Sequence, residues 1–469
     1  MKRILSFVLF MFFLILNGCS VPENVLPEYT VNNETVDMMG LVIRASRDEG
    51  DFAETYLGYR QGSSLYDEVA ARVSSVESKY NCSIEFLSDP NFSSNLSMRT
   101  AAGQSYVDFA LMTRYDRKLT QSGLLTPMSA ISDYIDYYDY EKWGTPNTLF
   151  QLVWDGELYG VIPVSWPEYY FTLVDFPIVS NTNKIRSMGF PDPREYVENK
   201  EWTRERFADC VNEYFHAEGE DVHYGISMYK PHFYDMAIRT SGVQMAIKTE
   251  NGWESGIHSQ TGREAIAWAI DFIQYTCKDS INDEDNETQA ALNAFCDGKS
   301  SLVLNHSNYI FASNSQYERV VSYEVENFGV LPFPVGPEVE YGQWIGQYER
   351  TPNTLIFPLV ANNTDAAAIV ANEIFEPLES CPDTAALENY YYDSIFFDKR
   401  DVSVIMQMLK NCTYNFYDEG LRQVADQLGN GKNDVNQLLD SMSDVYQSLI
   451  EENVIPIYES IDSIFNGKQ

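Results

Sequence analysis

The stretch that most constrains the fold is 294–334, in which a predicted helix, a glycine and a buried strand follow one another. Gly298 stands just past the predicted helix end, where glycine is favoured because it takes a positive φ without steric penalty. The continuous apolar run 302–304 is typical of a strand that is buried on both faces. A helix leading into such a strand predicts an α/β unit with a largely parallel sheet.

Polar and aromatic residues follow this predicted strand directly, from Asn305 to Tyr309. Open α/β sheets bind ligands at the carboxyl ends of their strands. The stretch therefore predicts one wall of a ligand site, with His306 and Asn308 as the hydrogen-bonding candidates.

The beginning of the chain supports the same fold class. An apolar strand at 41–43, a helical stripe over 65–80 and an alternating strand at 83–87 form a βαβ pattern. A further strand is predicted at 106–112. With 469 residues the chain is too long for one ordinary core, so we expect an α/β protein of two lobes.

The charge of the chain limits its partners. The formal net charge is −37. A field of this sign repels phosphate backbones, so we expect no nucleic-acid partner. The chain also has 32 tyrosines, which fit either large cores and a tyrosine-rich surface or a cleft whose rings stack on sugars.

The N-terminus has the pattern of an exported lipoprotein. Lys2 and Arg3 precede the apolar run 4–16, and Leu-Asn-Gly-Cys ends at Cys19. This pattern predicts a signal peptide at 1–19, lipidation of Cys19 and a polar tether at 20–36; the alternative is an ordinary signal peptide with an incidental cysteine. We expect the protein on the extracytoplasmic face of the cell membrane, held there by the lipid only.

The sequence has no recognisable catalytic or metal motif. The six remaining cysteines are scattered without a C-x-x-C pair, and we interpret most of them as buried free thiols. G-x-S-x-G, H-E-x-x-H and P-loop motifs are missing from the sequence. The acidic run 282–287 lacks the glycine and the spaced glutamate of a calcium loop, and Asp133, Asp136 and Asp139 could form a metal site but are more often solvated. We therefore predict no enzyme activity, no cofactor and no metal.

Several motifs taken together resemble a known family. They are YVDFALM (106–112), YGVIP (159–163), EWTRERFADC (201–210), AFCDGKSSLVLNHS (294–307), FGVLPFP (328–334) and NNTDAAAIVANEIF (362–375). In this order they resemble the extracellular solute-binding proteins of ABC importers, in the carbohydrate-binding branch similar to maltose-binding protein. The resemblance covers roughly 40–450.

This resemblance implies a two-lobed, type II periplasmic-binding-protein-like fold with the ligand cleft between the lobes. Lobe one is expected to comprise 37–152 plus 345–395, and lobe two 153–344 plus 396–469, with a first crossing at 154–167. The implied protein is a monomer that closes on a sugar and delivers it to the permease subunits of an ABC transporter without changing it.

The resemblance also implies ligand contacts at matching positions. Trp166 and Trp344 are expected to stack on sugar rings, although both also fit core packing. Asn308 stands where the family often has a ring, so hydrogen bonding is expected there. The full set of candidates is Arg114, Tyr115, Asp116, Trp166, Tyr229, His232, His306, Asn308, Trp344 and Tyr414.

Three other functions remain open at this point, one of which is a receptor that presents its ligand to a sensor kinase. The same fold could hold a non-sugar solute such as a peptide, a polyamine or an anion, and a cationic ligand would suit an acidic pocket. A secreted glycoside hydrolase would need two carboxylates about 5–10 Å apart across a cleft. No such pair stands out at a predicted strand end.

Overall fold

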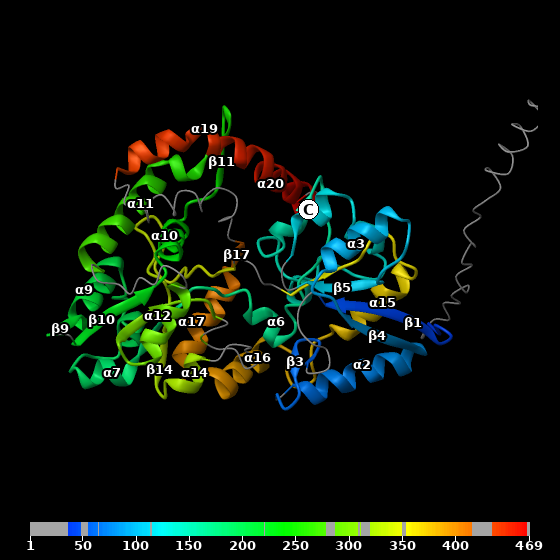
Figure 1. Cartoon of the computed structure of the whole chain (residues 1–469), viewed down its shortest axis with the longest axis horizontal. Coiled ribbons are helices and arrows are strands. Elements are labelled where there is room, and N and C mark those ends of the chain that lie inside the picture. The colour runs from blue at the N-terminus through cyan, green and yellow to red at the C-terminus, as the bar shows by residue number, and fades with distance from the viewer. Residues whose placement is uncertain are drawn as a thin grey trace, which may run out of the picture.

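The computed structural model describes residues 36–47, 55–63, 65–112, 115–219, 221–277, 287–307, 310, 319–348, 353–414 and 434–466. These residues form two α/β lobes, each built on its own sheet (Figure 1). The predicted signal peptide, Cys19 and most of the tether lie outside the described residues. No helix in the described ranges is long and apolar enough to cross a bilayer.

The sheet of lobe one has four strands in the order β16-β5-β1-β4. They are β1 (Leu41–Arg47), β4 (Cys82–Ser88), β5 (Phe109–Met112) and β16 (Thr354–Ile356). β1 pairs in parallel with β4 and β5, while β16 is antiparallel to β5. The predicted βαβ opening is confirmed, because α2 (Tyr66–Tyr80) connects β1 to β4 and buries Val69, Val73 and Val76.

The sheet of lobe two has five strands in the order β14-β8-β13-β10-β9. They are β8 (Ile178–Asn181), β9 (His216–Glu218), β10 (Asp221–Met228), β13 (Ser300–Leu304) and β14 (Phe328–Leu331). All five residues of β13 are buried, and β13 pairs in parallel with β10 and antiparallel with β8. Gly298, which precedes β13, has φ +70°. The expected buried strand after a glycine stop is therefore confirmed.

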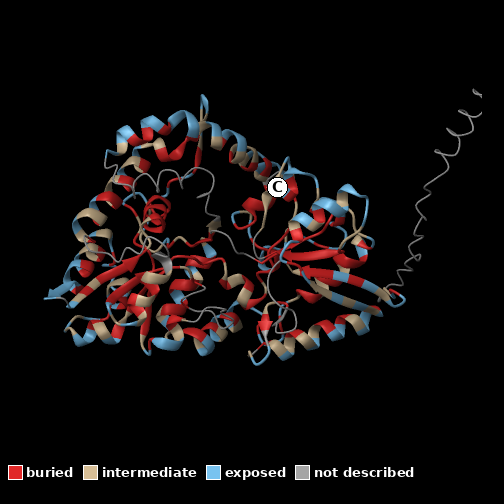
Figure 2. Cartoon of the chain, in the orientation of Figure 1, coloured by how far each residue is buried: buried red, intermediate tan, exposed pale blue. Residues whose placement is uncertain are grey.

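Helices surround both sheets, and burial is concentrated on the sheets and the helix faces turned toward them (Figure 2). Lobe one has α3 (Phe92–Ala101), α4 (Arg117–Gln121), α5 (Tyr140–Trp143) and α15 (Thr364–Ile374). Lobe two has α7 (Thr182–Ser187), α8 (Arg194–Glu198), α9 (Arg204–Tyr214), α10 (Lys230–Arg239), α11 (Gln260–Asp271), α12 (Glu287–Cys296), α14 (Val321–Glu324), α17 (Lys399–Lys410) and α19 (Val435–Asn453). The remaining helices are α6 (Pro167–Phe171), α16 (Thr384–Tyr391) and α20 (Ile455–Ile461).

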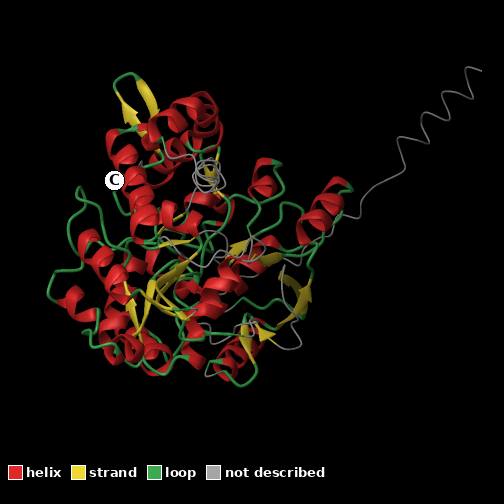
Figure 3. Ribbon diagram, turned by 60° about the vertical axis from the view of Figure 1, so that its left-hand side comes forward, coloured by secondary structure: helices red, strands yellow, loops and turns green. Residues whose placement is uncertain are grey.

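Short hairpins and tight turns complete the two lobes. The hairpins pair β2 (Thr55–Tyr56) with β3 (Tyr59–Arg60), β6 (Val153–Trp154) with β7 (Glu157–Leu158), and β11 (Ala246–Thr249) with β12 (Gly252–Ser255). Short 3₁₀ segments lie at Met128–Ile131, Phe150–Leu152 and Gly256–His258, and π-helical turns at Phe272–Thr276, Tyr392–Phe396 and Asp462–Asn466. The β11–β12 hairpin projects beyond the neighbouring helices (Figure 3).

Two helices of lobe two begin at side-chain caps. Thr203 caps α9 by accepting a hydrogen bond from the backbone N–H of Arg206. The residues 261–264 have the sequence pattern of a capping box, but Ser259 caps α11 and accepts from the N–H of Gly262. Glu264 instead accepts a hydrogen bond from Gln260, at 2.8 Å.

Three parts of the chain lie side by side in the layer where the lobes join. β15 (Gln347–Tyr348), on the return from lobe two, pairs in parallel with β17 (Thr413–Tyr414). Gln347 also bridges to Asp175, on the first passage to lobe two. Gly346 is needed at this point, because a Cβ there would lie 2.4 Å from the carbonyl oxygen of Met408 in α17. The crossing segments therefore pack closely against α17.

The hairpin predicted at the first crossing forms as expected, but it stays with lobe one. Its turn residues Asp155 and Gly156 both have positive φ, as a tight hairpin turn requires. Val161 then donates its N–H to the carbonyl of Leu355 in β16, at 3.0 Å. The chain passes to lobe two only after α6. The residue at which the lobes divide stays a prediction.

The six cysteines at 82, 210, 277, 296, 381 and 412 are free, and four of them are buried. The prediction that most are buried free thiols is confirmed. Burial raises the pKa of Cys82 to about 11, so its thiol stays protonated at neutral pH.

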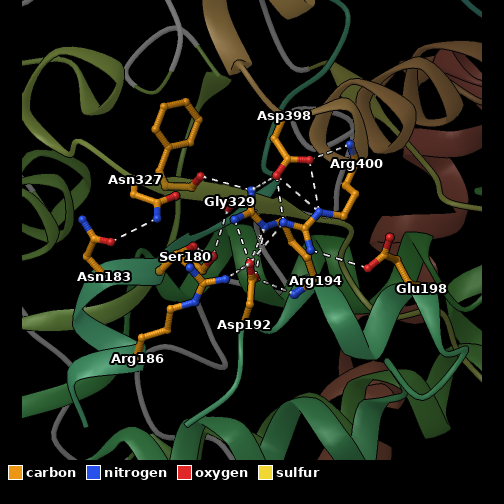
Figure 4. Close-up of polar contacts among 12 residues, drawn as sticks. Ser180, Asn183, Arg186, Asp192, Arg194, Glu198, Asn327, Gly329, Asp398 and Arg400 are labelled. Carbon is orange, nitrogen blue, oxygen red and sulfur yellow. Dashed lines mark hydrogen bonds and ion pairs between the residues drawn. The ribbon is translucent and has the colours of Figure 1, made fainter. Parts of the chain in front are cut away.

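A buried network of ion pairs fixes the start of α17 after the third passage between the lobes (Figure 4). The guanidinium of Arg194 contacts Asp192 at 2.8 Å, and Asp398 and Asp401 at 3.0 Å each. Arg400 adds contacts to Asp192 and Asp398. Asp401 also accepts the backbone N–H of Val330 in β14, at 2.8 Å. The network therefore ties α8 and α17 to the sheet of lobe two.

The carboxylates of this network differ in their affinity for protons. Burial raises the pKa of Asp401 to about 7, although Arg194 opposes the shift. Burial acts in the same direction on Asp192, but hydrogen bonds from Arg194 outweigh it, and the pKa of Asp192 is lowered. Because burial raises the pKa of Asp401 and the pKa of Asp192 is lowered, Asp401 gains a proton before Asp192 does.

This difference predicts a pH effect on stability. Because the pKa of Asp401 is higher in the folded chain than its ordinary 3.8, the folded state binds the extra proton between pH 3.8 and about 7. The stability that this bound proton gives the folded chain is therefore lost as the pH rises from 3.8 to about 7. Asp401→Asn removes the titration, so the free energy of unfolding of the variant relative to wild type should rise by about 2–4 kcal/mol from pH 4 to pH 8. Urea unfolding at both pH values measures this difference, and equal pH dependence in the two proteins would contradict it.

Candidate ligand site between the lobes

The strand ends of lobe two bring together three of the predicted site residues. Tyr229 follows β10 and is followed by α10, while His306 comes two residues after β13. The two strands are parallel, so their carboxyl ends meet at one edge. The ring of His232 lies 4.7 Å from that of Tyr229 and 4.8 Å from that of His306. Tyr229 and His306 are half-buried and His232 is buried.

Two further residues complete this cluster, and the sequence analysis missed both. Asp175 accepts the N–H of Ser307 with Oδ1, and its Oδ2 lies 3.3 Å from Nδ1 of His306. The ring of Phe176 lies 4.1 Å from His232 and 4.6 Å from His306. The available signal was a lone aspartate in an apolar run, VDFPIV, directly before a strand. We call Asp175, Phe176, Tyr229, His232 and His306 the strand-end cluster.

The strand-end cluster is connected to the crossing segments by hydrogen bonds. The backbone N–H of Asp175 donates to the carbonyl of Gln347, at 2.6 Å. The side-chain amide of Gln347 in turn donates to Asp235 of α10, at 2.8 Å. Asp235 lies three residues after His232, on the same face of the helix. The strand-end cluster is therefore linked directly to the segments that join the lobes.

The strand end of lobe one has a different character. Arg114 lies outside the described residues. The hydroxyl of Tyr115 is hydrogen-bonded to Thr120, and burial raises its pKa. Asp116 caps α4 by accepting the N–H of Lys118, at 3.0 Å. Tyr115 and Asp116 thus stabilise the start of α4, at the edge where β5 ends.

Both predicted stacking tryptophans are core residues, so these two predictions are wrong. Trp166 is fully buried; its ring lies 4.8 Å from that of Phe375 and donates its N–H to the carbonyl of Glu376. Trp344 is 3% exposed and packs edge-on against Tyr341. Neither side chain is exposed enough to offer a ring face to a sugar.

The last two candidates are only partly described. Asn308 lies outside the described residues. The backbone of Tyr414 belongs to β17, where it pairs with Tyr348, so the residue lies in the crossing layer.

A separate groove of about 960 Å³ lies between α16 and α17, and none of the strand-end cluster lines it. Lys142, in its wall, contacts Glu376 at 2.5 Å and the side-chain oxygen of Asn372 at 2.9 Å. Burial lowers the pKa of Lys142, while Glu376 opposes the shift. In the described ranges no group of three or more histidine, cysteine, aspartate or glutamate side chains is arranged to hold a metal ion.

Solved structures with the same architecture identify the fold. A binding protein for cyclic α-maltosyl-1,6-maltose from Arthrobacter globiformis superposes with a TM-score of 0.59 at 12% identity, over 88% of this chain and all of that one. The GacH receptor of Streptomyces glaucescens, studied with acarbose, gives 0.56 at 12% identity, over 88% of this chain and 99% of the receptor. A substrate-binding protein of an ABC transporter from Listeria monocytogenes, in complex with cycloalternan, superposes with a TM-score of 0.51 at 12% identity. The superposition covers 92% of this chain and 99% of that one.

The chain has the type II periplasmic-binding fold of these maltose-binding-protein-like receptors. This agrees with the fold that the sequence motifs implied. No protein-family model and no curated protein matches the sequence. At 12% identity the likeness establishes the architecture, so the ligand must be argued from the residues of this chain.

Asp175 should be important for the shape of the site. Asp175→Ala removes the acceptor for the buried N–H of Ser307 and the partner of His306, so it should cost about 1–3 kcal/mol of stability. Asp175→Asn keeps an oxygen for Ser307 and should cost less. Urea unfolding of both variants measures the difference, and an unchanged stability of Asp175→Ala would contradict the role assigned to this carboxylate.

Proposed function

We propose that the protein is an extracytoplasmic receptor that binds a sugar or oligosaccharide between its two lobes and delivers it to an ABC permease. The observation that carries this proposal is the strand-end cluster, which lies at the ligand-binding edge of one sheet and is hydrogen-bonded to the crossing segments. Proteins with the same fold include receptors crystallised with acarbose, maltotetraose and cycloalternan, which supports the ligand class.

The chemistry of the cluster suits a sugar. Flat rings such as those of Tyr229 and His306 pack against the CH faces of a pyranose. Imidazole nitrogens and the phenol hydroxyl offer both donors and acceptors to its hydroxyl groups. The formal net charge of −37 favours such a neutral ligand over an anion.

The proposal describes a binding protein and not an enzyme. The cluster contains one carboxylate, Asp175, whose two oxygens are already engaged by Ser307 and His306. A glycoside hydrolase requires a second carboxylate facing the first across the scissile bond. An oligosaccharide that is incubated with the protein should therefore stay uncleaved, as measured by chromatography.

A thermal-shift screen tests the ligand class. Maltodextrins, cyclodextrins, other oligosaccharides, polyamines and amino acids are added to the purified protein at millimolar concentration. A ligand that binds only the folded state at about 100 times its Kd adds about 2.7 kcal/mol of stability, which raises the melting temperature by several degrees. We expect an oligosaccharide to produce this shift, and His306→Ala to reduce it.

Tyr196→Ala is a matched control, since this half-buried tyrosine of lobe two packs under Arg206 and contacts no residue of the strand-end cluster. It should keep the shift. Stabilisation by polyamines or amino acids, with no effect of any sugar, would refute the carbohydrate assignment and favour a non-sugar receptor of the same fold.

Membrane attachment through Cys19 is the second part of the proposal. The sequence ending Leu-Asn-Gly-Cys supports lipidation of this thiol, which would anchor the receptor beside its permease. Cys19→Ser should move the protein from the membrane fraction to the soluble fraction, as measured by immunoblot after ultracentrifugation. Retention of Cys19→Ser in the membrane fraction would contradict lipid anchoring at this residue.

A further inference from the structure

The last two described α-helices, α19 and α20, extend from one lobe to the other (Figure 1). α19 belongs to lobe two: the carbonyl of Leu439 lies 3.0 Å from Nε2 of His258, and Asp440 pairs with Arg263 at 2.9 Å. The hydroxyl of Tyr446 donates to the sulfur of Met245, at 3.6 Å. These contacts fix α19 to α11 and to the segment before β11.

α20 and the π-helical turn after it belong to the surface of lobe one. Ser460 accepts the N–H of Gly156 in the β6–β7 turn, at 2.9 Å. The hydroxyl of Tyr138 donates to the carbonyl of Ile464, at 3.2 Å. The ring of Phe465 packs against Tyr138 and Tyr140, at 6.0 and 6.1 Å. The chain therefore returns to lobe one after its third passage.

The joint between the two helices lies at the edge where β5 ends. α19 stops at Asn453, whose carbonyl accepts a hydrogen bond from Arg117, at 3.0 Å. Arg117 is the first residue of α4, the helix that follows β5 in lobe one. Pro456 lies in the first turn of α20 and has no N–H to continue the α19 ladder. The helices are thus two rigid pieces with a break between them.

One ring contacts both lobes at this joint. Tyr458 stacks on Trp253 of the β11–β12 hairpin, with ring centres 5.5 Å apart and planes at 24°. The same ring meets Phe150 of lobe one edge-on, at 4.8 Å and 77°. The indole N–H of Trp253 also reaches Glu459, at 3.4 Å. Separation of the lobes must break the contact of Tyr458 with at least one of its two partners.

We propose that α19 and α20 form a strap that limits how far the lobes open, with Tyr458 as its interlobe contact. The three crossing segments alone permit a hinge motion about their short shared layer. The strap adds a fourth connection away from that layer (Figure 1). Opening then requires loss of the contact between Tyr458 and Trp253 and of the hydrogen bond between Arg117 and Asn453.

The strap has a consequence for binding that rests on the proposed function. A receptor whose binding-competent closed state is rarely populated loses apparent affinity in proportion to that population. A strap that restrains opening raises the population before any ligand arrives. The restraint itself does not depend on the identity of the ligand and is tested without one.

The test is a distance measurement in the ligand-free, full-length protein. Spin labels are introduced through non-natural amino acids at Met98 of lobe one and Tyr275 of lobe two, which are 64% and 68% exposed, so the native cysteines stay untouched. Pulsed electron resonance then gives the distribution of the interlobe distance. Tyr458→Ala should increase the open fraction up to about tenfold, as expected for the loss of one aromatic pair between the lobes. Tyr458→Phe, which keeps the ring, should match wild type.

Two further variants complete the test. Tyr196→Ala removes an equivalent ring inside lobe two and should leave the distance unchanged. Trp253→Ala removes only the lobe-two half of the contact and replaces Tyr458→Ala if that variant does not fold. The proposed strap is contradicted if Tyr458→Ala and Trp253→Ala both give the wild-type distance distribution. Both variants must have normal melting curves for this comparison.

Discussion

The structure depends on the hydrogen bond by which Asp175 donates its backbone N–H to the carbonyl of Gln347. It joins the first and second passages between the lobes, and β15 joins the second to β17. The side chains of the same two residues extend to His306 and to Asp235. One short layer therefore connects the lobes and also positions the residues at the ligand edge of lobe two. This dual role is what a receptor needs if a ligand in the cleft is to act on the hinge.

Much of the architecture could be predicted because it follows from local patterns. The buried run 302–304 and the glycine before it predict β13, and the apolar stripe over 65–80 predicts α2. The parallel pairing of β1 with β4 follows because a helix connects these two strands. The rings and polar groups after β10 and β13 could be predicted for the same reason, since strand order places them at one edge. These features need only the sequence periodicity and the geometry of parallel sheets.

The rest of the site depends on contacts between distant parts of the chain. A sequence pattern cannot tell a tryptophan of the core from one in a cleft, and Trp166 is enclosed by Phe375, more than 200 residues away along the chain. Asp175 was missed because its partners come from β13 and β15. The capping of α11 by Ser259 in place of the 261–264 box shows the same limit on a smaller scale. The interlobe contacts of Tyr458 have no local signature either.

The central claim is that a sugar binds between the lobes at the strand-end cluster, and a crystal structure of the complex tests it most directly. The protein is crystallised with the oligosaccharide that stabilises it most. The account predicts ligand density in contact with Tyr229 and His306, on the side of the crossing segments where β5 also ends. Density only in the separate groove between α16 and α17, with the strand-end cluster empty, would contradict it.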